Sequence, residues 1–315
     1  MRETISIAFA CDEAYARHVA VVIKSIFANA EETDSFEFHI ITMELTALSQ
    51  SRLQQIAKDN GSTLEIHYIE PSRLSEFPES RLTLNAYLRL FIPELFSEKN
   101  KILYLDADLI VLDSLRSLWE HPLDNCAVAA AVDSMECFGG SSLEHFRNLG
   151  LPPAHAYFNS GVLLLNLKNL RDIQLLEKVI AWFPNNIYPY ADQDALNATL
   201  VGQISYFHDR WNLQVPLIDT VRFGWGCLQE QAEAVANPAI IHYVTERKAW
   251  CREYKLPFQK LYFQYLSQTP WKTESFPAYT LAEGLNRFKE EMDWCYKWAR
   301  SEIRRKLGRH PQPTR

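Results

Sequence analysis

The chain has 315 residues, of which 47% are hydrophobic and 23% are charged, and its formal net charge is −7. This composition excludes a disordered protein, and the length allows one large α/β domain with an appendage, or two small domains. The negative charge argues against nucleic acid as a general partner. No segment reaches the roughly 18 apolar residues that are needed to cross a bilayer.

The cysteines and the N-terminus both bear on where the protein works. Six cysteines are scattered without a Cys-x-x-Cys pair, and several stand in apolar stretches, as Cys126 does. Such thiols are typical of a reducing compartment and give no indication of a structural zinc site. The chain enters a strand-like run at residue 5 without a signal-peptide pattern. We therefore expect a cytoplasmic protein.

Strand and helix patterns alternate along the first third of the chain. In order, we expect a strand over 5–11, a helix over 15–28, a strand over 36–42, a helix over 49–60, a strand over 63–69, a helical stretch over 83–96 and a strand over 101–105. This order predicts an α/β fold with a mostly parallel sheet and helices on both faces. Ligands of such sheets gather at the carboxyl ends of the strands.

The pattern continues and then changes character. We expect strands over 127–132, 161–167, 203–207 and 239–243 and a helix over 170–183. Beyond Pro257 the chain becomes aromatic-rich and helical. We therefore expect a catalytic domain over 1–256 and a helical, aromatic and basic C-terminal appendage over 257–315.

A pair of aspartates ends one apolar strand. Asp106 and Asp108 follow the run 101–105 and stand one residue apart, so their side chains point to the same side of an extended chain. Two such carboxylates suit Mg²⁺ or Mn²⁺, which prefer oxygen ligands and often bridge to substrate phosphates. Solvated aspartates at a turn are the simpler alternative, but the apolar strand favours a metal site.

A histidine ends another apolar strand, and a lysine follows it. His242 would complete an Asp/Asp/His ligand set that favours manganese over magnesium, because imidazole is a softer donor than carboxylate. Taken alone, a histidine in this position is more often structural. Lys248 could bind a diphosphate as a point charge, or could be an ordinary surface lysine.

Two polar clusters accompany these residues. Asp192, Gln193 and Asp194 open a helical run over 195–200, where a helix cap readily explains one of the two acids. The other reading places Asp192 and Gln193 against a polyhydroxylated ligand. Asn159 stands in an Asn-Ser-Gly tripeptide and could bond sugar hydroxyls, although a plain turn also explains the tripeptide.

Four motifs in this order resemble glycosyltransferase family 8. They are Asp106-Ala-Asp108, Phe158-Asn-Ser-Gly161, Asp192-Gln-Asp194 and His242-Tyr-x-x-x-x-Lys248, within a resemblance over residues 5–250. The family contains bacterial lipopolysaccharide galactosyl- and glucosyltransferases and glycogenin. The resemblance implies a GT-A fold, Mn²⁺ with Mg²⁺ as the alternative ion, a UDP-galactose or UDP-glucose donor, and retention at the anomeric carbon. The acceptor would be a saccharide or glycolipid, such as lipopolysaccharide.

At the nucleotide end, the resemblance implies that Asp106, Asp108 and His242 are metal ligands, with Asp106 also near the ribose. Asp12, in Phe9-Ala-Cys-Asp12, would contact uracil or ribose, and Lys248 would bind the diphosphate.

Two departures from the family pattern fall in the same part of the site. Ala14 stands where the family commonly has asparagine, which removes one uridine contact. Val244 and Thr245 stand where it often has a small pair, which changes the backbone approach to the phosphates.

At the sugar end, the resemblance implies that Arg89, in Tyr87-Leu-Arg-Leu, contacts the donor, and that Asp133 and Asn159 line the donor sugar and acceptor. Asp192 would hold hexose hydroxyls, and Gln193 would lie beneath the anomeric carbon. A neutral amide is a weaker nucleophile than the carboxylate of retaining glycosidases. We therefore expect same-face attack by the acceptor hydroxyl, assisted by the departing phosphate oxygen, with a covalent intermediate on Asp192 as the alternative.

The C-terminal end is strongly basic. Residues 299–315 contain six basic residues and one acid. An apolar stripe leads into them, formed by Phe288, Met292, Cys295, Ala299, Ile303 and Leu307. This make-up is typical of a helix on an anionic membrane surface, so we expect peripheral contact with the cytoplasmic face of the inner membrane. Docking on the catalytic domain is the alternative for 288–299.

Two other functions stay open at this point. A phosphohydrolase with a nucleophilic aspartate also uses Asp-x-Asp, but on an early strand and with Thr or Val after the motif, where this chain has Leu109. A sugar-nucleotide-binding protein with a decayed active site is the non-enzymatic alternative. The Val244-Thr245 departure keeps it open, although all three proposed metal ligands are present.

Overall fold

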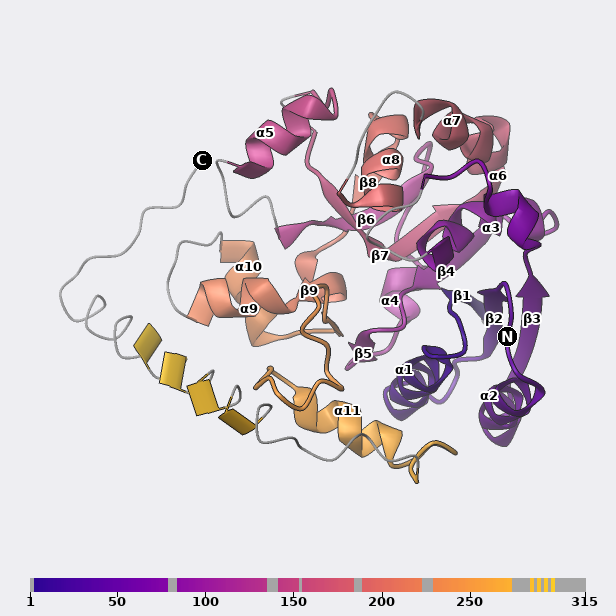
Figure 1. Cartoon of the computed structure of the whole chain (residues 1–315). Helices are drawn as coiled ribbons and strands as arrows, with labels where there is room; N and C mark the ends of the chain where they lie inside the picture. Colours follow the sequence, from indigo (N-terminus) through magenta and orange to yellow (C-terminus); the bar gives the residue numbers. More distant parts are fainter. Residues whose placement is uncertain are drawn as a thin grey trace.

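The computed structural model describes residues 3–78, 84–134, 141–152, 155–183, 189–222 and 229–273, with the pairs 284–285, 288–289, 292–293 and 296–297. Its centre is a seven-stranded sheet in the order β3-β2-β1-β4-β7-β6-β8 (Figure 1). The strands are β1 (Ile5–Ala10), β2 (Phe36–Thr42), β3 (Thr63–Tyr68), β4 (Lys101–Leu105), β6 (Val128–Val132), β7 (Phe158–Asn166) and β8 (Ile204–Tyr206).

The sheet is mixed and mostly parallel, as expected. β1 runs parallel to β2 and to β4, β2 runs parallel to β3, and β6 runs parallel to β8. β7 runs antiparallel to both β4 and β6. Side chains of β1 enter two cores in alternation: Ile7 and Phe9 pack on one face of the sheet and Ala8 on the other. A strand buried on both faces reads as a continuous apolar run, which is why this sheet was recognisable in the sequence.

Helices cover both faces (Figure 1). One core contains residues of α1 (Ala16–Ala28) and α2 (Ala47–Asp59). The other contains residues of α6 (Leu167–Asp172), α7 (Leu175–Trp182) and α8 (Ala191–Thr199). The remaining helical elements are η1 (Pro71–Leu74), η2 (Leu84–Phe91), α3 (Ile92–Leu95), α4 (Arg116–Trp119), α5 (Ser141–Asn148), η5 (Asp209–Asn212), α9 (Val215–Arg222), α10 (Gln229–Ala236) and α11 (Gln259–Leu266).

Several expected elements differ in detail. Within the expected helical stretch, residues 84–91 form the 3₁₀ helix η2 and residues 92–95 form one turn of α3, and the expected helix 170–183 is interrupted before α7 by Gln174, whose φ is 53°. Asn159 lies inside β7, so the interpretation of its tripeptide as a turn is wrong. β7 pairs with Val132 at Phe158 and with Leu105 at Val162, so the residues between these two pairs continue the strand.

A second, three-stranded sheet has the order β5-β10-β9, from β5 (Leu109–Val111), β10 (Ile240–His242) and β9 (Leu213–Gln214). The strand expected over 239–243 therefore belongs to this small sheet and not to the main one. β10 pairs antiparallel with β5, and His242 lies opposite Leu109. This register brings the end of β10 next to Asp108, because Asp108 directly precedes β5.

The first part of the C-terminal region packs on the main body. Tyr262 of α11 contacts His18 of α1, with 2.6 Å between the hydroxyl and Nδ1, and Trp271 belongs to the same core as α1. The division between 1–256 and 257–315 stays a prediction.

The apolar stripe of the tail lies largely outside the described residues, since Cys295, Ala299, Ile303 and Leu307 are not among them. Its described members Phe288 and Met292 are exposed. No helix in the described part of the chain is long and apolar enough to span a membrane.

Candidate active site

A pocket of about 520 Å³ opens beside the carboxyl ends of β1 and β4. Small-molecule sites commonly have volumes of about 300–1,000 Å³. All ten residues singled out in the sequence line this pocket: Asp12, Arg89, Asp106, Asp108, Asp133, Asn159, Asp192, Gln193, His242 and Lys248.

The topology of the sheet explains the position of the pocket. The chain adds β2 and β3 on one side of β1, and then places β4 on the other side. A crevice forms at such a reversal, outside the carboxyl ends of the two central strands. Asp12 follows β1 closely, and Asp106 directly follows β4. The ends of β1 and β4 thus each place one carboxylate at this crevice.

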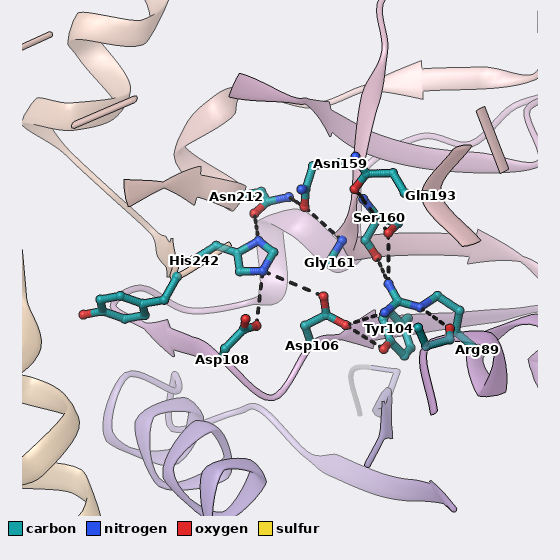
Figure 2. A network of polar contacts seen from close by, with 12 residues as sticks. Arg89, Tyr104, Asp106, Asp108, Asn159, Ser160, Gly161, Gln193, Asn212 and His242 are labelled. Carbon is teal, nitrogen blue, oxygen red and sulfur yellow. Dashed lines mark hydrogen bonds and ion pairs between the residues drawn. The ribbon is translucent and has the colours of Figure 1, made fainter. Parts of the chain in front are cut away.

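The three expected metal ligands converge in this pocket (Figure 2). One ligand atom from each of Asp106, Asp108 and His242 lies within 4.8 Å of the other two. His242 Nε2 is 3.2 Å from Asp108 Oδ1 and 3.8 Å from Asp106 Oδ2. Asp108 Oδ1 is buried and has no hydrogen-bond partner among the described residues. A buried carboxylate oxygen in this condition is costly unless a proton or a cation reaches it.

A chain of amides fixes the orientation of the His242 ring (Figure 2). The Gly161 amide N–H donates to Asn159 Oδ1, at 3.0 Å, so this atom is an acceptor. Asn212 must then present its NH₂ group to the same oxygen, at 2.9 Å, and its own oxygen to His242 Nδ1, at 2.8 Å. Nδ1 therefore carries a proton, and Nε2 is the ring nitrogen that faces Asp106 and Asp108. Amides that orient a metal-binding histidine in this way are common in metal sites.

Gly161 allows β7 to pass directly beside these ligands. A Cβ atom at this position would lie 2.1 Å from His242 Cε1 and 2.8 Å from Asp106 Oδ2. No larger residue fits without moving the ligands. A glycine inside a buried strand often marks such a close approach, and this signal was available in the sequence.

Lys248 is largely buried, so its interpretation as an ordinary surface lysine is wrong. Its Nζ donates to Asp108 Oδ2 and to the Tyr243 carbonyl. Burial favours the neutral form of both Lys248 and Asp108, but their opposite charges outweigh it. The pKa of Asp108 is therefore lowered, by Lys248 and His242, and the pKa of Lys248 is raised by Asp108.

Arg89 joins the two ends of the pocket. Its guanidinium contacts Asp106 Oδ1 at 2.9 Å and Asp192 Oδ2 at 3.1 Å, and it donates to the Ser160 carbonyl at 2.7 Å. Burial raises the pKa of Asp192 to about 6, and the charge of Arg89 only partly opposes this shift.

At the end of the pocket where the donor sugar is expected, Asp133 accepts hydrogen bonds from two amides. Asn159 Nδ2 lies 2.9 Å and Gln193 Nε2 lies 3.1 Å from Asp133 Oδ2. The Gln193 oxygen accepts the Ser160 backbone N–H at 3.0 Å. The Gln193 amide is thus held at both of its ends, and its oxygen is already engaged as an acceptor.

Asp194 has a structural role. It is fully buried and accepts hydrogen bonds from the Tyr157 hydroxyl, at 2.5 Å, and from the backbone N–H of Tyr190 at the start of α8, at 3.0 Å. His145 Nε2 lies 2.8 Å from the same carboxylate. A helix-start role for one of the two acids in this motif is therefore correct.

Sequence reasoning missed several residues that line the pocket or support its side chains. Tyr15 lines the pocket with an aromatic ring that is 37% exposed, and Asn85 donates to Asp12 Oδ2 at 2.8 Å. Asn212, in η5, carried no recognisable signal, because it stands in a short helical turn far from every motif. The departures Val244 and Thr245 also line the pocket, beside His242.

Comparison with known proteins identifies the family. The family model described as glycosyl transferase family 8 matches residues 6–253. The chain is 28% identical over 287 residues to general stress protein A of Bacillus subtilis, which covers 88% of this chain and 98% of that protein. It is 28% identical over 296 residues to a lipopolysaccharide 1,2-glucosyltransferase of Escherichia coli, with 91% and 85% covered.

Among solved structures, the galactosyltransferase LgtC in complex with donor and acceptor sugar analogues is similar with a TM-score of 0.75. The sequence identity is 24%, and 86% of this chain and 100% of LgtC are covered. This likeness confirms the expected GT-A fold. The family match removes the phosphohydrolase alternative, because it places the chain among enzymes that transfer sugars. The chain belongs to glycosyltransferase family 8.

Proposed function

We propose that this glycosyltransferase moves a hexose, glucose or galactose, from a UDP-sugar to a saccharide acceptor, with retention at the anomeric carbon. One observation carries the proposal. Nε2 of His242 faces Asp108 Oδ1 across 3.2 Å, with Asp106 beside them, and Asp108 Oδ1 accepts no hydrogen bond among the described residues. An imidazole and two carboxylates that converge in this way hold either a proton on Nε2 or a divalent ion between them, and we propose that the ion takes this place when the donor is bound.

The ligand set fits a divalent ion. Asp106, Asp108 and His242 offer two carboxylates and one imidazole, which favours Mn²⁺, with Mg²⁺ as the alternative. Held there, the ion would act as a Lewis acid on the departing diphosphate. Lys248 would exchange its bond with Asp108 for one with a phosphate oxygen, since its ammonium group is already at the edge of the site.

The nucleoside end of the donor matches the polar mouth of the pocket. Asp12 accepts from Asn85 at Oδ2 and from the Tyr15 backbone N–H at Oδ1. Each carboxylate oxygen has a second lone pair, which can accept from uracil or a ribose hydroxyl. The exposed ring of Tyr15 offers a face for the base. These contacts compensate for the asparagine that is replaced by Ala14.

The sugar end supports same-face transfer. Gln193 is held by Asp133 and by the Ser160 amide, so it is positioned to stabilise the sugar by its dipole and not to leave its place as a nucleophile. Asp192 is paired with Arg89 and would accept hexose hydroxyls. The acceptor hydroxyl would attack from the face that the phosphate leaves and would pass its proton to the departing phosphate oxygen. A covalent intermediate on Asp192 is the alternative.

The acceptor is proposed as a cell-surface glycan such as lipopolysaccharide. This rests on the relative named as a lipopolysaccharide 1,2-glucosyltransferase, and on a second relative, a lipopolysaccharide 1,3-galactosyltransferase of Salmonella typhimurium that is 26% identical over 284 residues. We also propose a cytoplasmic location with peripheral membrane contact through the basic tail.

The test is hydrolysis of the donor without acceptor. The protein is incubated with UDP-glucose or UDP-galactose and Mn²⁺, and the released hexose is followed by proton NMR before its anomers equilibrate. We expect slow release of the α-anomer from one donor. Release of the β-anomer would contradict retention. Binding of UDP-sugar without any release, even with added saccharide acceptors, would favour the non-enzymatic alternative.

A further inference from the structure

We propose that His39, Glu65 and His67 form a second metal site, for Zn²⁺, near the edge of the main sheet. This site is separate from the pocket, since none of the three residues lines it. One ligand atom from each residue lies within 4.8 Å of the other two. The scattered cysteines gave no indication of zinc, but this candidate site is built from imidazole and carboxylate groups.

The backbone places the three side chains on one face of the sheet. β2 and β3 are parallel neighbours, and His39 is the register partner of Glu65. Glu65 and His67 stand two residues apart on β3, so their side chains point to the same face. The juxtaposition follows from the strand pairing and does not depend on a loop.

The distances suit a tetrahedral ion. His39 Nδ1 is 3.1 Å from His67 Nε2, and Glu65 Oε2 is 3.8 Å from the first and 3.9 Å from the second. Ligand atoms at about 2.0–2.1 Å from a tetrahedral zinc ion lie about 3.3 Å apart. A set of two imidazoles and one carboxylate binds Zn²⁺ in preference to Mg²⁺ or Ca²⁺.

Both imidazoles are held in place and kept uncharged. The ring of Phe96 packs against them, with centroid distances of 4.6 Å to His39 and 4.9 Å to His67. Burial lowers the pKa of His39 to about 4 and also lowers the pKa of His67, so both rings are neutral at neutral pH. Nε2 of His39 has no hydrogen-bond partner among the described residues. The ring proton can therefore stay on Nε2, which leaves the lone pair of Nδ1 available for the metal.

The nearby charges do not exclude a cation. Lys99 is the cation that acts on both histidines, and it is paired with Glu37. Glu65 is left to supply the negative charge of the site. Its side chain is 67% exposed, so water can reach a fourth position on the ion. A bound ion would tie the edge strand β3 to β2, which stabilises the sheet edge.

The experiment separates this site from the catalytic one. The Asp108→Ala protein retains the three proposed zinc ligands but lacks one ligand of the pocket. Titration of this protein with Co²⁺ should give the visible absorption of tetrahedral cobalt with one equivalent bound, and excess Zn²⁺ should remove it. We expect Glu65→Gln and His67→Gln, each in the Asp108→Ala background, to weaken Co²⁺ binding at least about tenfold.

His121→Gln in the same background is the control, because His121 is a partly buried histidine outside both sites. It should bind Co²⁺ as the Asp108→Ala protein does. The proposal is overturned if His67→Gln leaves binding unchanged, or if the folded Asp108→Ala protein binds no Co²⁺. Neither result bears on the proposed transferase activity, which does not use these residues.

Discussion

Two buried carboxylates at opposite ends of the pocket behave in opposite ways. Asp108 and Asp192 are both almost inaccessible to solvent, and burial alone would raise the pKa of each. Lys248 and His242 reverse this effect for Asp108, whereas Asp192 shares the cation Arg89 with Asp106 and keeps a pKa of about 6. The end of the pocket with Asp108, where the cation is expected (the cation end), therefore carries a fixed charge. The end with Asp192 (the titrating end) carries a charge that titrates near neutral pH.

Loss of the fixed charge at Asp108 should have the largest effect on transfer. Asp108→Ala should lower transfer from the UDP-sugar by at least about 10³-fold, since Lewis-acid stabilisation of the leaving group contributes several kcal/mol. Gln193→Ala should leave measurable transfer, because the Gln193 amide is expected to stabilise the sugar by its dipole and to form no covalent bond with it. The measurement is UDP release at saturating Mn²⁺, with the exposed Asp172→Ala as the control. Equal and total loss in both pocket variants would count against same-face transfer.

A methyl group added beside the proposed metal ligands, with every ligand retained, should have the next largest effect. Gly161→Ala would force His242 and Asp106 apart, and overpacking of this kind costs about 1–3 kcal/mol. We expect Mn²⁺ affinity, read from the free-ion EPR signal, to fall about 100-fold. Gly202→Ala is the control, because it strains a turn at φ 76° with nothing within 4 Å of the added atom. If both variants bind Mn²⁺ equally, the close approach of β7 is irrelevant to the site.

Asn212 tests whether the orientation of His242 matters. Asn212→Leu removes the acceptor for Nδ1 and should weaken Mn²⁺ binding by about 10–100-fold, as is usual for groups that orient a ligand. Asn212→Asp keeps an acceptor and should lose less. Unchanged binding in Asn212→Leu would mean that the ring is held by packing alone.

The smallest effect is expected at the titrating end. The pKa of Asp192 is about 6, so its carboxylate is lost as the pH falls through this value, and kcat/KM should decline about tenfold per pH unit below it. Asp192→Asn should be slower at all pH values and lack this limb. A wild-type profile that is flat between pH 5 and 7 would contradict the assignment of this pKa to Asp192.

Seven of the ten pocket residues could be named from the sequence pattern, because they sit at strand ends or in polar clusters beside apolar runs. The other three, Asp12, Arg89 and Asp133, were named only through the resemblance to the family. Asp106 and Asp108 follow an apolar run that forms β4. The carboxyl end of such a strand lies at one end of the sheet, whatever the order of the strands. The roles given to these residues remain predictions. Asn212 could not be found, because its importance comes from touching His242 and Asn159, which are distant in the chain.

The direction of each strand, and the sheet to which it belongs, could not be predicted from the sequence either. β7 and β4 have the same apolar character, yet they run antiparallel, because hydrophobicity reports burial and not direction. The run ending at His242 looked like one more strand of the main sheet. It pairs instead with β5, and this pairing depends on where the chain turns after Asp108.

The pairing of β10 with β5 has a consequence for the newly made chain. Two of the proposed ligands come from residues 106 and 108, but the third arrives only with residue 242. A polypeptide still emerging from the ribosome at residue 110 contains two of the three proposed ligands and lacks the imidazole. Contacts between residues so distant in the chain are slow to close during folding. With the proposed ligand roles, transfer would begin only after residue 242 has been synthesised.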